Sequence, residues 1–206
     1  MRRLILAWAV VLVAVPTQSR AEDAFNAWLT EAPGRAESFA AFQAALAGEG
    51  VSGVVADEQL WMVDQLNPRC ATARFAAPPE ALWPAMFATL RLLRDHVAPA
   101  LGAVRVVSAW RSEAFNTCLG GAARSAHREF IALDLVPVDP AITRVQLIER
   151  LCAVHRALGP QSRFGLGIYS GRRFHIDTRS FRGWGADHRG ASFPCPAALS
   201  PPRQPR

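Results

Sequence analysis

The chain has 206 residues, of which 50% are hydrophobic and 19% charged, with 23 basic against 17 acidic side chains and a net charge of +6. This length fits one domain with a substantial core. All the basic residues are arginines, and they are scattered along the chain rather than interleaved with aromatic side chains. That pattern argues against nucleic acid as a partner.

The first 21 residues have the layout of a secretory signal peptide. Arg2 and Arg3 precede an uncharged run from Leu4 to Pro16, and a small-x-small cleavage pattern ends at Ala21. The run is too short to span a bilayer, and no other stretch approaches the roughly 20 apolar residues that a transmembrane helix needs. The sequence therefore predicts an exported, monomeric protein, periplasmic or secreted, without a membrane span.

The cysteines also indicate export. The chain has an even number of them and no C-x-x-C pair: Cys70, Cys118, Cys152 and Cys195. In an exported protein this predicts two disulfides rather than a thiolate metal site or a catalytic thiol. Three pairings are open, and we expect Cys70–Cys118 with Cys152–Cys195.

Apolar periodicity predicts three helices. Two of them cover residues 36–46 and roughly 80–100. The third begins with a capping box formed by Thr143 and Gln146, and it ends at Gly159.

Short apolar, β-branched stretches predict the strands. Residues 103–109 and 131–137 are two candidates, and residues 163–179 are expected to form two further strands joined by a turn at Ser170 and Gly171. After the signal peptide at 1–21, we expect three parts: a helical N-terminal part of the same domain (22–107), the core (108–193) and an extended or disordered tail (194–206).

His127 and Asp134 lie seven positions apart in "SAHREFIALDL". Asp134 interrupts an apolar run, and an ionised carboxylate there is costly to bury unless a cation meets it. A metal ion or one of the arginines would serve equally well.

A second histidine and aspartate occur in "RFHIDT". If this stretch is a strand, His175 and Asp177 project from the same face, because side chains alternate with period two. Two histidines and one aspartate, with a fourth position left to water, describe a catalytic zinc site. The sequence therefore predicts Zn2+ held by His127, Asp134 and His175, with Asp177 as the nearest candidate base.

Arg111 follows a predicted strand in "SAWRS". An arginine at a strand end, flanked by serines, is suited to binding a carboxylate or an oxyanion. Its ordinary alternative is an exposed surface arginine. Arg111, Ser108 and Ser125 are therefore the substrate-binding candidates.

Three segments together resemble the zinc D-alanyl-D-alanine carboxypeptidase family, which includes murein endopeptidases. They are "SAWRSEAFN" (108–116), "GGAARSAHREFIALDL" (120–135) with its H-x6-D motif, and "FGLGIYSGRRFHIDTRSFRGWG" (164–185) with its F-H-x-D motif. The resemblance implies an α+β fold, with a small central antiparallel sheet, helices on its outer side and the zinc site on the sheet. It also implies zinc-dependent hydrolysis of peptide bonds in peptidoglycan, commonly next to D-alanine, with Arg111 contacting the substrate.

The chain departs from this family at two positions. Phe130 stands where the family often has a glycine, and we expect it to narrow the entrance to the site. Arg172 stands where some members carry an acidic general base, three residues before the last zinc histidine. Asp177 is then the preferred candidate for the base, with a role in orienting His175 as the alternative.

Two other functions stay open. A wall-binding or scaffold protein could keep the fold without catalysis, as the hedgehog signalling domain does. Kinship with the extensin-like carboxy-terminal domain, which has a comparable H-x6-D pattern, would leave the substrate open. The sequence does not indicate which peptidoglycan bond is cut.

Overall fold

The computed structural model describes residues 17–63, 70 and 73–195. Most of the predicted signal peptide and of the predicted tail lies outside these residues. The predicted cleavage position at Ala21 lies within the first helix, which begins at Thr17. In the part of the chain that is described, no helix has both the length and the apolar character to cross a bilayer.

The predicted helices and strands are present, with shifts of a few residues at their ends. A π-helical turn, Leu93–Val97, joins α3 to α4, so that the helix expected over 80–100 is continuous from Trp83. The capping box of Thr143 and Gln146 begins α6 as predicted. The helices and strands in chain order are α1 (Thr17–Thr30), α2 (Arg35–Gly48), α3 (Trp83–Leu92), α4 (Ala98–Leu101), β1 (Val104–Ser108), α5 (Glu113–Cys118), β2 (Ala132–Pro137), α6 (Arg144–Leu158), β3 (Gly165–Ile168), β4 (Phe174–Asp177) and β5 (Arg182–Trp184).

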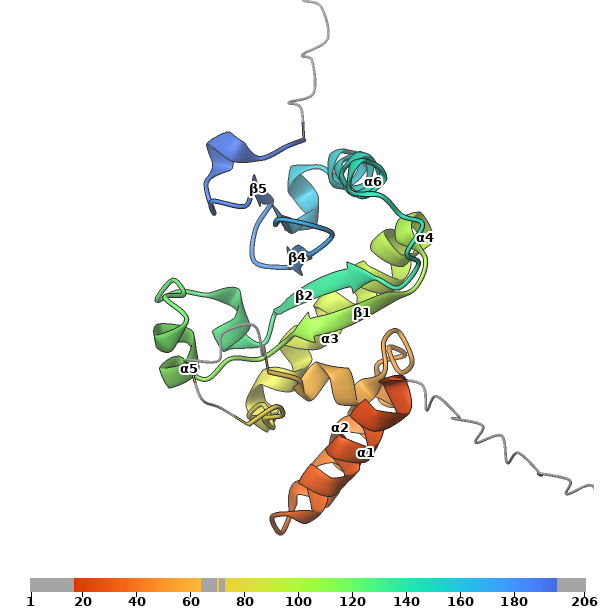
Figure 1. Cartoon of the computed structure of the whole chain (residues 1–206), viewed down its shortest axis with the longest axis vertical. Coiled ribbons are helices and arrows are strands. Elements are labelled where there is room, and N and C mark those ends of the chain that lie inside the picture. The colour runs from red at the N-terminus through yellow and green to blue at the C-terminus, as the bar shows by residue number, and fades with distance from the viewer. Residues whose placement is uncertain (1–16, 64–69, 71–72, 196–206) are drawn as a thin grey trace, which may run out of the picture.

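The strands form one sheet in the order β1-β2-β4-β3-β5. Neighbouring strands are antiparallel except β3 and β5, which are parallel. Helix α3 runs behind β1 and β2 in Figure 1, and Thr89 of this helix donates a hydrogen bond to the carbonyl of Ile131 at 2.8 Å, just before β2. This arrangement confirms the expected α+β fold, and the short parallel strand β5 is an addition to the antiparallel sheet.

Alternation along the strands divides the sheet into an apolar and a polar face. Leu133 and Leu135 of β2 and Ile176 of β4 are fully buried in the same core cluster as the apolar side chains of α2 and α3. The residues between them on β2 and β4 include Asp134 and His175, which lie opposite each other in the register. The apolar face thus anchors the sheet to the helices, and the polar face carries the candidate site.

The glycines of β3 leave room for that polar face. Gly165 lies opposite Asp177 and Gly167 lies opposite His175. A Cβ atom on Gly165 would lie 2.6 Å from the Asp177 carboxylate oxygens, and one on Gly167 would lie 2.5 Å from the indole of Trp184. Larger residues at either position would displace a side chain of the site.

Phe130 does not narrow an entrance, contrary to the expectation from the sequence. Its side chain is fully buried in the core, with its ring centroid 6.2 Å from that of Phe42. Its backbone adopts φ 54, the left-handed conformation that glycine takes most readily. Burial of a large aromatic side chain offsets the cost of that conformation.

Both expected disulfides are present. Cys70 is bonded to Cys118 at the end of α5, and Cys152 of α6 is bonded to Cys195. Their sequence separations are 48 and 43 residues, so each closes a long loop. The first ties the segment preceding the sheet to α5, and the second ties α6 to the chain beyond β5.

Candidate metal centre

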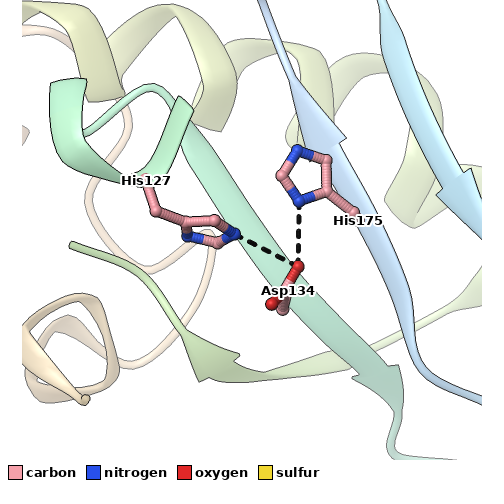
Figure 2. A group of neighbouring side chains, drawn as sticks. All are labelled: His127, Asp134 and His175. Atoms are coloured by element: carbon pink, nitrogen blue, oxygen red, sulfur yellow. Dashed lines mark hydrogen bonds and ion pairs between the residues drawn. The ribbon is translucent and has the colours of Figure 1, made fainter. Parts of the chain in front are cut away.

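Three side chains from separate elements meet on the polar face of the sheet (Figure 2). His127 lies on the single helical turn Ala126–Glu129, Asp134 on β2 and His175 on β4. One potential ligand atom of each lies within 4.8 Å of the other two, and all three residues are buried. The structure thus brings together the set that the sequence predicted as metal ligands.

His127 presents an unprotonated nitrogen to this cluster. Its Nδ1 lies 2.6 Å from the carbonyl oxygen of Ala109, which can only accept, so Nδ1 donates and Nε2 carries the lone pair. Burial, and then the charge of Arg111, lower the pKa of His127 to about 4, so the imidazole is neutral. Nε2 is buried, lacks a hydrogen-bond partner among the described residues and lies 3.3 Å from Oδ1 of Asp134.

That pair of atoms is the observation that fits a metal ion. A lone pair facing a carboxylate oxygen in a buried site is unfavourable unless a cation lies between the two atoms. Neutral imidazole nitrogen and carboxylate oxygen are both common ligands of Zn2+. The donor set of His127, Asp134 and His175 is therefore able to hold a metal ion.

The two oxygens of Asp134 have different surroundings. Oδ1 lies 3.3 Å from Nε2 of His127 and 2.9 Å from Nδ1 of His175, whereas Oδ2 accepts hydrogen bonds from Arg111 at 2.8 Å and from Arg173 at 2.6 Å. Burial opposes ionisation of Asp134, but the hydrogen bond with His175 outweighs burial, and the pKa of Asp134 is held well below its ordinary value. Oδ1 is thus the oxygen directed at the metal position.

His175 lies between two carboxylates. Its Nδ1 is 2.9 Å from Oδ1 of Asp134, and its Nε2 is 2.9 Å from Oδ2 of Asp177. Burial alone would lower the pKa of His175, but the hydrogen bonds with Asp134 and Asp177 outweigh burial and raise it. A metal ion bound at Nδ1 would leave Nε2–H to donate to Asp177.

Asp177 is fully buried, and both of its oxygens are engaged. Arg182 donates to Oδ1 at 2.9 Å and to Oδ2 at 2.6 Å, and the backbone N–H of Arg179 donates to Oδ1 at 2.9 Å. Burial raises the pKa of Asp177, but His175 and Arg182 outweigh it and lower the pKa to about 2. These contacts favour the orienting role for Asp177 over the role of general base.

Arg111 and Ser108 lie beside the cluster. Ser108 is fully buried and accepts a hydrogen bond from Nε of Arg111 at 3.1 Å, so it holds the arginine rather than facing solvent. The side chain of Arg111 is 13% exposed. It therefore reaches from Asp134 towards the surface of the protein.

Ser125 and Arg111 both line a neighbouring surface cavity of about 430 Å³. Three arginines line it, Arg111, Arg124 and Arg128, against two glutamates, Glu113 and Glu129. Each glutamate is within ion-pair distance of an arginine, Glu113 of Arg128 at 3.2 Å and Glu129 of Arg179 at 2.7 Å. The residues that line this cavity thus carry one more positive than negative charge.

Sequence reasoning did not single out Arg173, Arg182, Tyr169 or Trp184. The Tyr169 and Trp184 rings contact His175, with centroid distances of 6.5 and 5.0 Å. Arg173 could have been found, because it stands two residues before His175 and so shares its strand face. Arg182 could not have been found in this way, because its contact with Asp177 depends on the pairing of β5 with β3.

Arg172, at the position of the acidic base in some relatives, is directed away from the cluster. Its guanidinium donates hydrogen bonds to the carbonyls of Asp139 and Ile142 at 2.7 and 3.4 Å. It also lines a different cavity, at the other end of β1. Arg172 therefore contributes no acid–base group to the cluster.

Comparison with known proteins agrees with this chemistry. Residues 61–177, more than half of the chain, match the family model described as Peptidase M15. The matched segment includes all three residues of the candidate metal centre. No match is found among the curated proteins or among the solved structures.

Proposed function

Because the chain belongs to the peptidase M15 family, we propose that it is an exported zinc peptidase that hydrolyses a peptide bond in the peptidoglycan stem or cross-link, next to D-alanine. The observation that carries this proposal is the buried cluster of His127, Asp134 and His175. Three protein ligands with a further position open to substrate or water are the arrangement of catalytic rather than structural zinc. When bound there, zinc supplies Lewis-acid chemistry that activates water for attack on a peptide carbonyl.

The residues around the cluster have separate tasks in this proposal. His127 and His175 are held by Ala109 and Asp177, respectively, so that each ring presents one nitrogen to the metal. Asp134 supplies the only carboxylate of the ligand set. Arg111 is positioned to contact the substrate, since it bonds to Asp134 and also lines the adjacent cavity.

The charge of that cavity supports a substrate with a free carboxylate. Three arginines against two glutamates leave positive charge beside the metal centre, and arginine binds carboxylates through forked hydrogen bonds. A peptide that ends near the cleaved bond would place its carboxylate there. We therefore favour a carboxypeptidase over an endopeptidase, with a peptidoglycan peptide as substrate.

Export is supported by the disulfides. Both pairs would be unstable in a reducing cytosol, whereas they persist in the periplasm and outside the cell. The layout of the first 21 residues supports the same location.

The metal content of the purified protein tests the proposal, with hydrolysis of muropeptides followed by mass spectrometry on the same samples. We expect about one zinc per chain in the wild type, and loss of both zinc and cleavage in His175→Ala. His96→Ala is the matched control, because His96 is an exposed histidine on the turn Leu93–Val97. A wild type that binds no metal would overturn the proposal.

A second candidate function is supported by Arg172 and by the contacts of Asp177. Among the described residues, the carboxylates of Asp134 and Asp177 lie closest to the metal position, and each accepts a hydrogen bond from an arginine. Neither is therefore free to act as a general base. A non-catalytic wall-binding or scaffold protein would keep the zinc and lack the cleavage. Zinc without hydrolysis of any muropeptide, in the experiment above, would favour this function.

A further inference from the structure

We propose that Arg173 is a positioning residue that restricts Asp134 to a single metal-binding oxygen. This inference rests on the proposed zinc site and goes beyond it, because it concerns how the protein controls the number of ligand atoms. Arg173 immediately precedes β4 and lies two residues before His175, on the same face of the chain. Its side chain is 16% exposed.

The contacts of Arg173 place its charge on one specific atom. Nη2 donates to Oδ2 of Asp134 at 2.6 Å, and the guanidinium lies 5.6 Å from the ring centroid of Tyr169. Tyr169 is itself half-buried, and its ring contacts those of His175 and His188. The guanidinium thus contacts both an aromatic ring and a carboxylate, a combination that favours arginine over lysine.

Arg111 reaches the same oxygen from the segment between β1 and α5. Its Nη2 donates to Oδ2 of Asp134 at 2.8 Å, so two guanidinium groups bind one carboxylate oxygen. A carboxylate without such donors can chelate a metal ion through both oxygens. With Oδ2 engaged twice, only Oδ1 faces His127 and His175, and the protein supplies three ligand atoms rather than four.

This restriction matters for the proposed reaction. A catalytic zinc site needs an open coordination position for water or substrate. If Asp134 became bidentate, its second oxygen would occupy part of that space. Arg173 therefore acts through Asp134 and keeps the position open, without contacting the substrate.

The experiment uses the full-length mature protein loaded with Co2+ in place of zinc, since the visible absorption of Co2+ reports its coordination number and geometry. The variant Arg173→Met keeps an unbranched apolar side chain next to Tyr169 and removes the guanidinium that donates to Oδ2 of Asp134. We expect the Co2+ absorption bands of this variant to weaken several-fold as the ion gains a ligand atom. We also expect kcat of the zinc form to fall about 10–100-fold with KM unchanged.

Two further variants make the result specific. Arg173→Lys keeps a charged donor that can form the single bond to Oδ2, so it should recover the wild-type spectrum and part of kcat. Arg172→Met removes the same charge from the neighbouring residue, whose guanidinium bonds to the carbonyls of Asp139 and Ile142. It should leave the spectrum unchanged.

An unchanged Co2+ spectrum and unchanged kcat in Arg173→Met would overturn the inference. A rise in KM alone would also overturn it, because it would assign Arg173 to substrate contact. Arg173→Gln gives the same readouts if the methionine variant does not fold. These outcomes differ from failure of the proposed function, in which the wild type itself binds no metal.

Discussion

Oδ2 of Asp177 accepts a hydrogen bond from Nε2 of His175 at 2.9 Å, on the side of the ring opposite Asp134. This carboxylate fixes which nitrogen of His175 is protonated, and it orients the ring towards the metal position. Arg182 and the backbone N–H of Arg179 hold the carboxylate in turn. The candidate metal centre is therefore supported by further contacts, which run from β4 past β3 to β5.

This relationship predicts the effect of Asp177→Asn. The zinc affinity should fall about 10–100-fold, because the uncharged amide is a weaker acceptor for Nε2–H and can also present its NH2 group to the ring. The measurement is a competition titration with a chelator of known affinity. Asp187→Asn, at an exposed aspartate in the loop after β5, is the control and should bind zinc as the wild type does.

The same variant separates the two roles considered for Asp177. If Asp177 were a general base, its replacement would lower kcat but leave the zinc affinity intact. Undiminished zinc affinity in Asp177→Asn, together with a large loss of kcat, would therefore contradict the orienting role.

The pH dependence of zinc binding should reflect one histidine rather than two. The pKa of His175 is raised, so this histidine is protonated at any pH below that pKa, and zinc must displace its proton. The pKa of His127 is lowered to about 4, so His127 is neutral over the same pH range. Between about pH 5 and 6.5, the zinc affinity should fall about tenfold for each unit that the pH is lowered. Isothermal titration at several pH values measures this slope, and a hundredfold change per unit would show that both histidines titrate there.

Gly167→Ala should disturb the aromatic side of the site. The added Cβ would lie 2.5 Å from the indole of Trp184, which packs against His175. We expect the free energy of unfolding to fall by about 1–3 kcal/mol, with a change in tryptophan fluorescence, because the indole must move.

Urea unfolding followed by fluorescence checks the glycine prediction. Gly48→Ala, at the end of α2, is the matched control, since a Cβ atom there has no heavy atom within 4 Å. It should be neutral or slightly stabilising, because alanine is the better helix former. Equal stability of the two variants would show that Trp184 moves aside at little cost.

Removal of the Cys152–Cys195 disulfide should lower the free energy of unfolding by about 2–4 kcal/mol. The bond closes a loop with a sequence separation of 43 residues, so the unfolded chain gains considerable freedom without it. The double variant Cys152→Ala, Cys195→Ala is compared with the wild type in guanidinium unfolding. Equal midpoints and slopes for the two proteins would contradict a stabilising role.

Much of the ligand set was accessible from the sequence because its spacing is a local property. Asp134 stood out as a carboxylate inside an apolar run, and His175 and Asp177 were assigned to one face because strands alternate with period two. The capping box of α6 is likewise a local signal. These patterns depend only on residues a few positions apart, so the sequence alone determined them.

The partners of the charged groups were decided only by the tertiary structure. Arg172 and Arg173 are adjacent and chemically identical, yet Arg173 binds Asp134 and Arg172 binds backbone carbonyls beyond β2. Arg182 reaches Asp177 because β5 lies parallel to β3, which no local pattern indicated. The chain has 23 arginines, so each carboxylate had many possible partners. The register of the strands and the course of the chain after β4 determine which arginine each carboxylate meets.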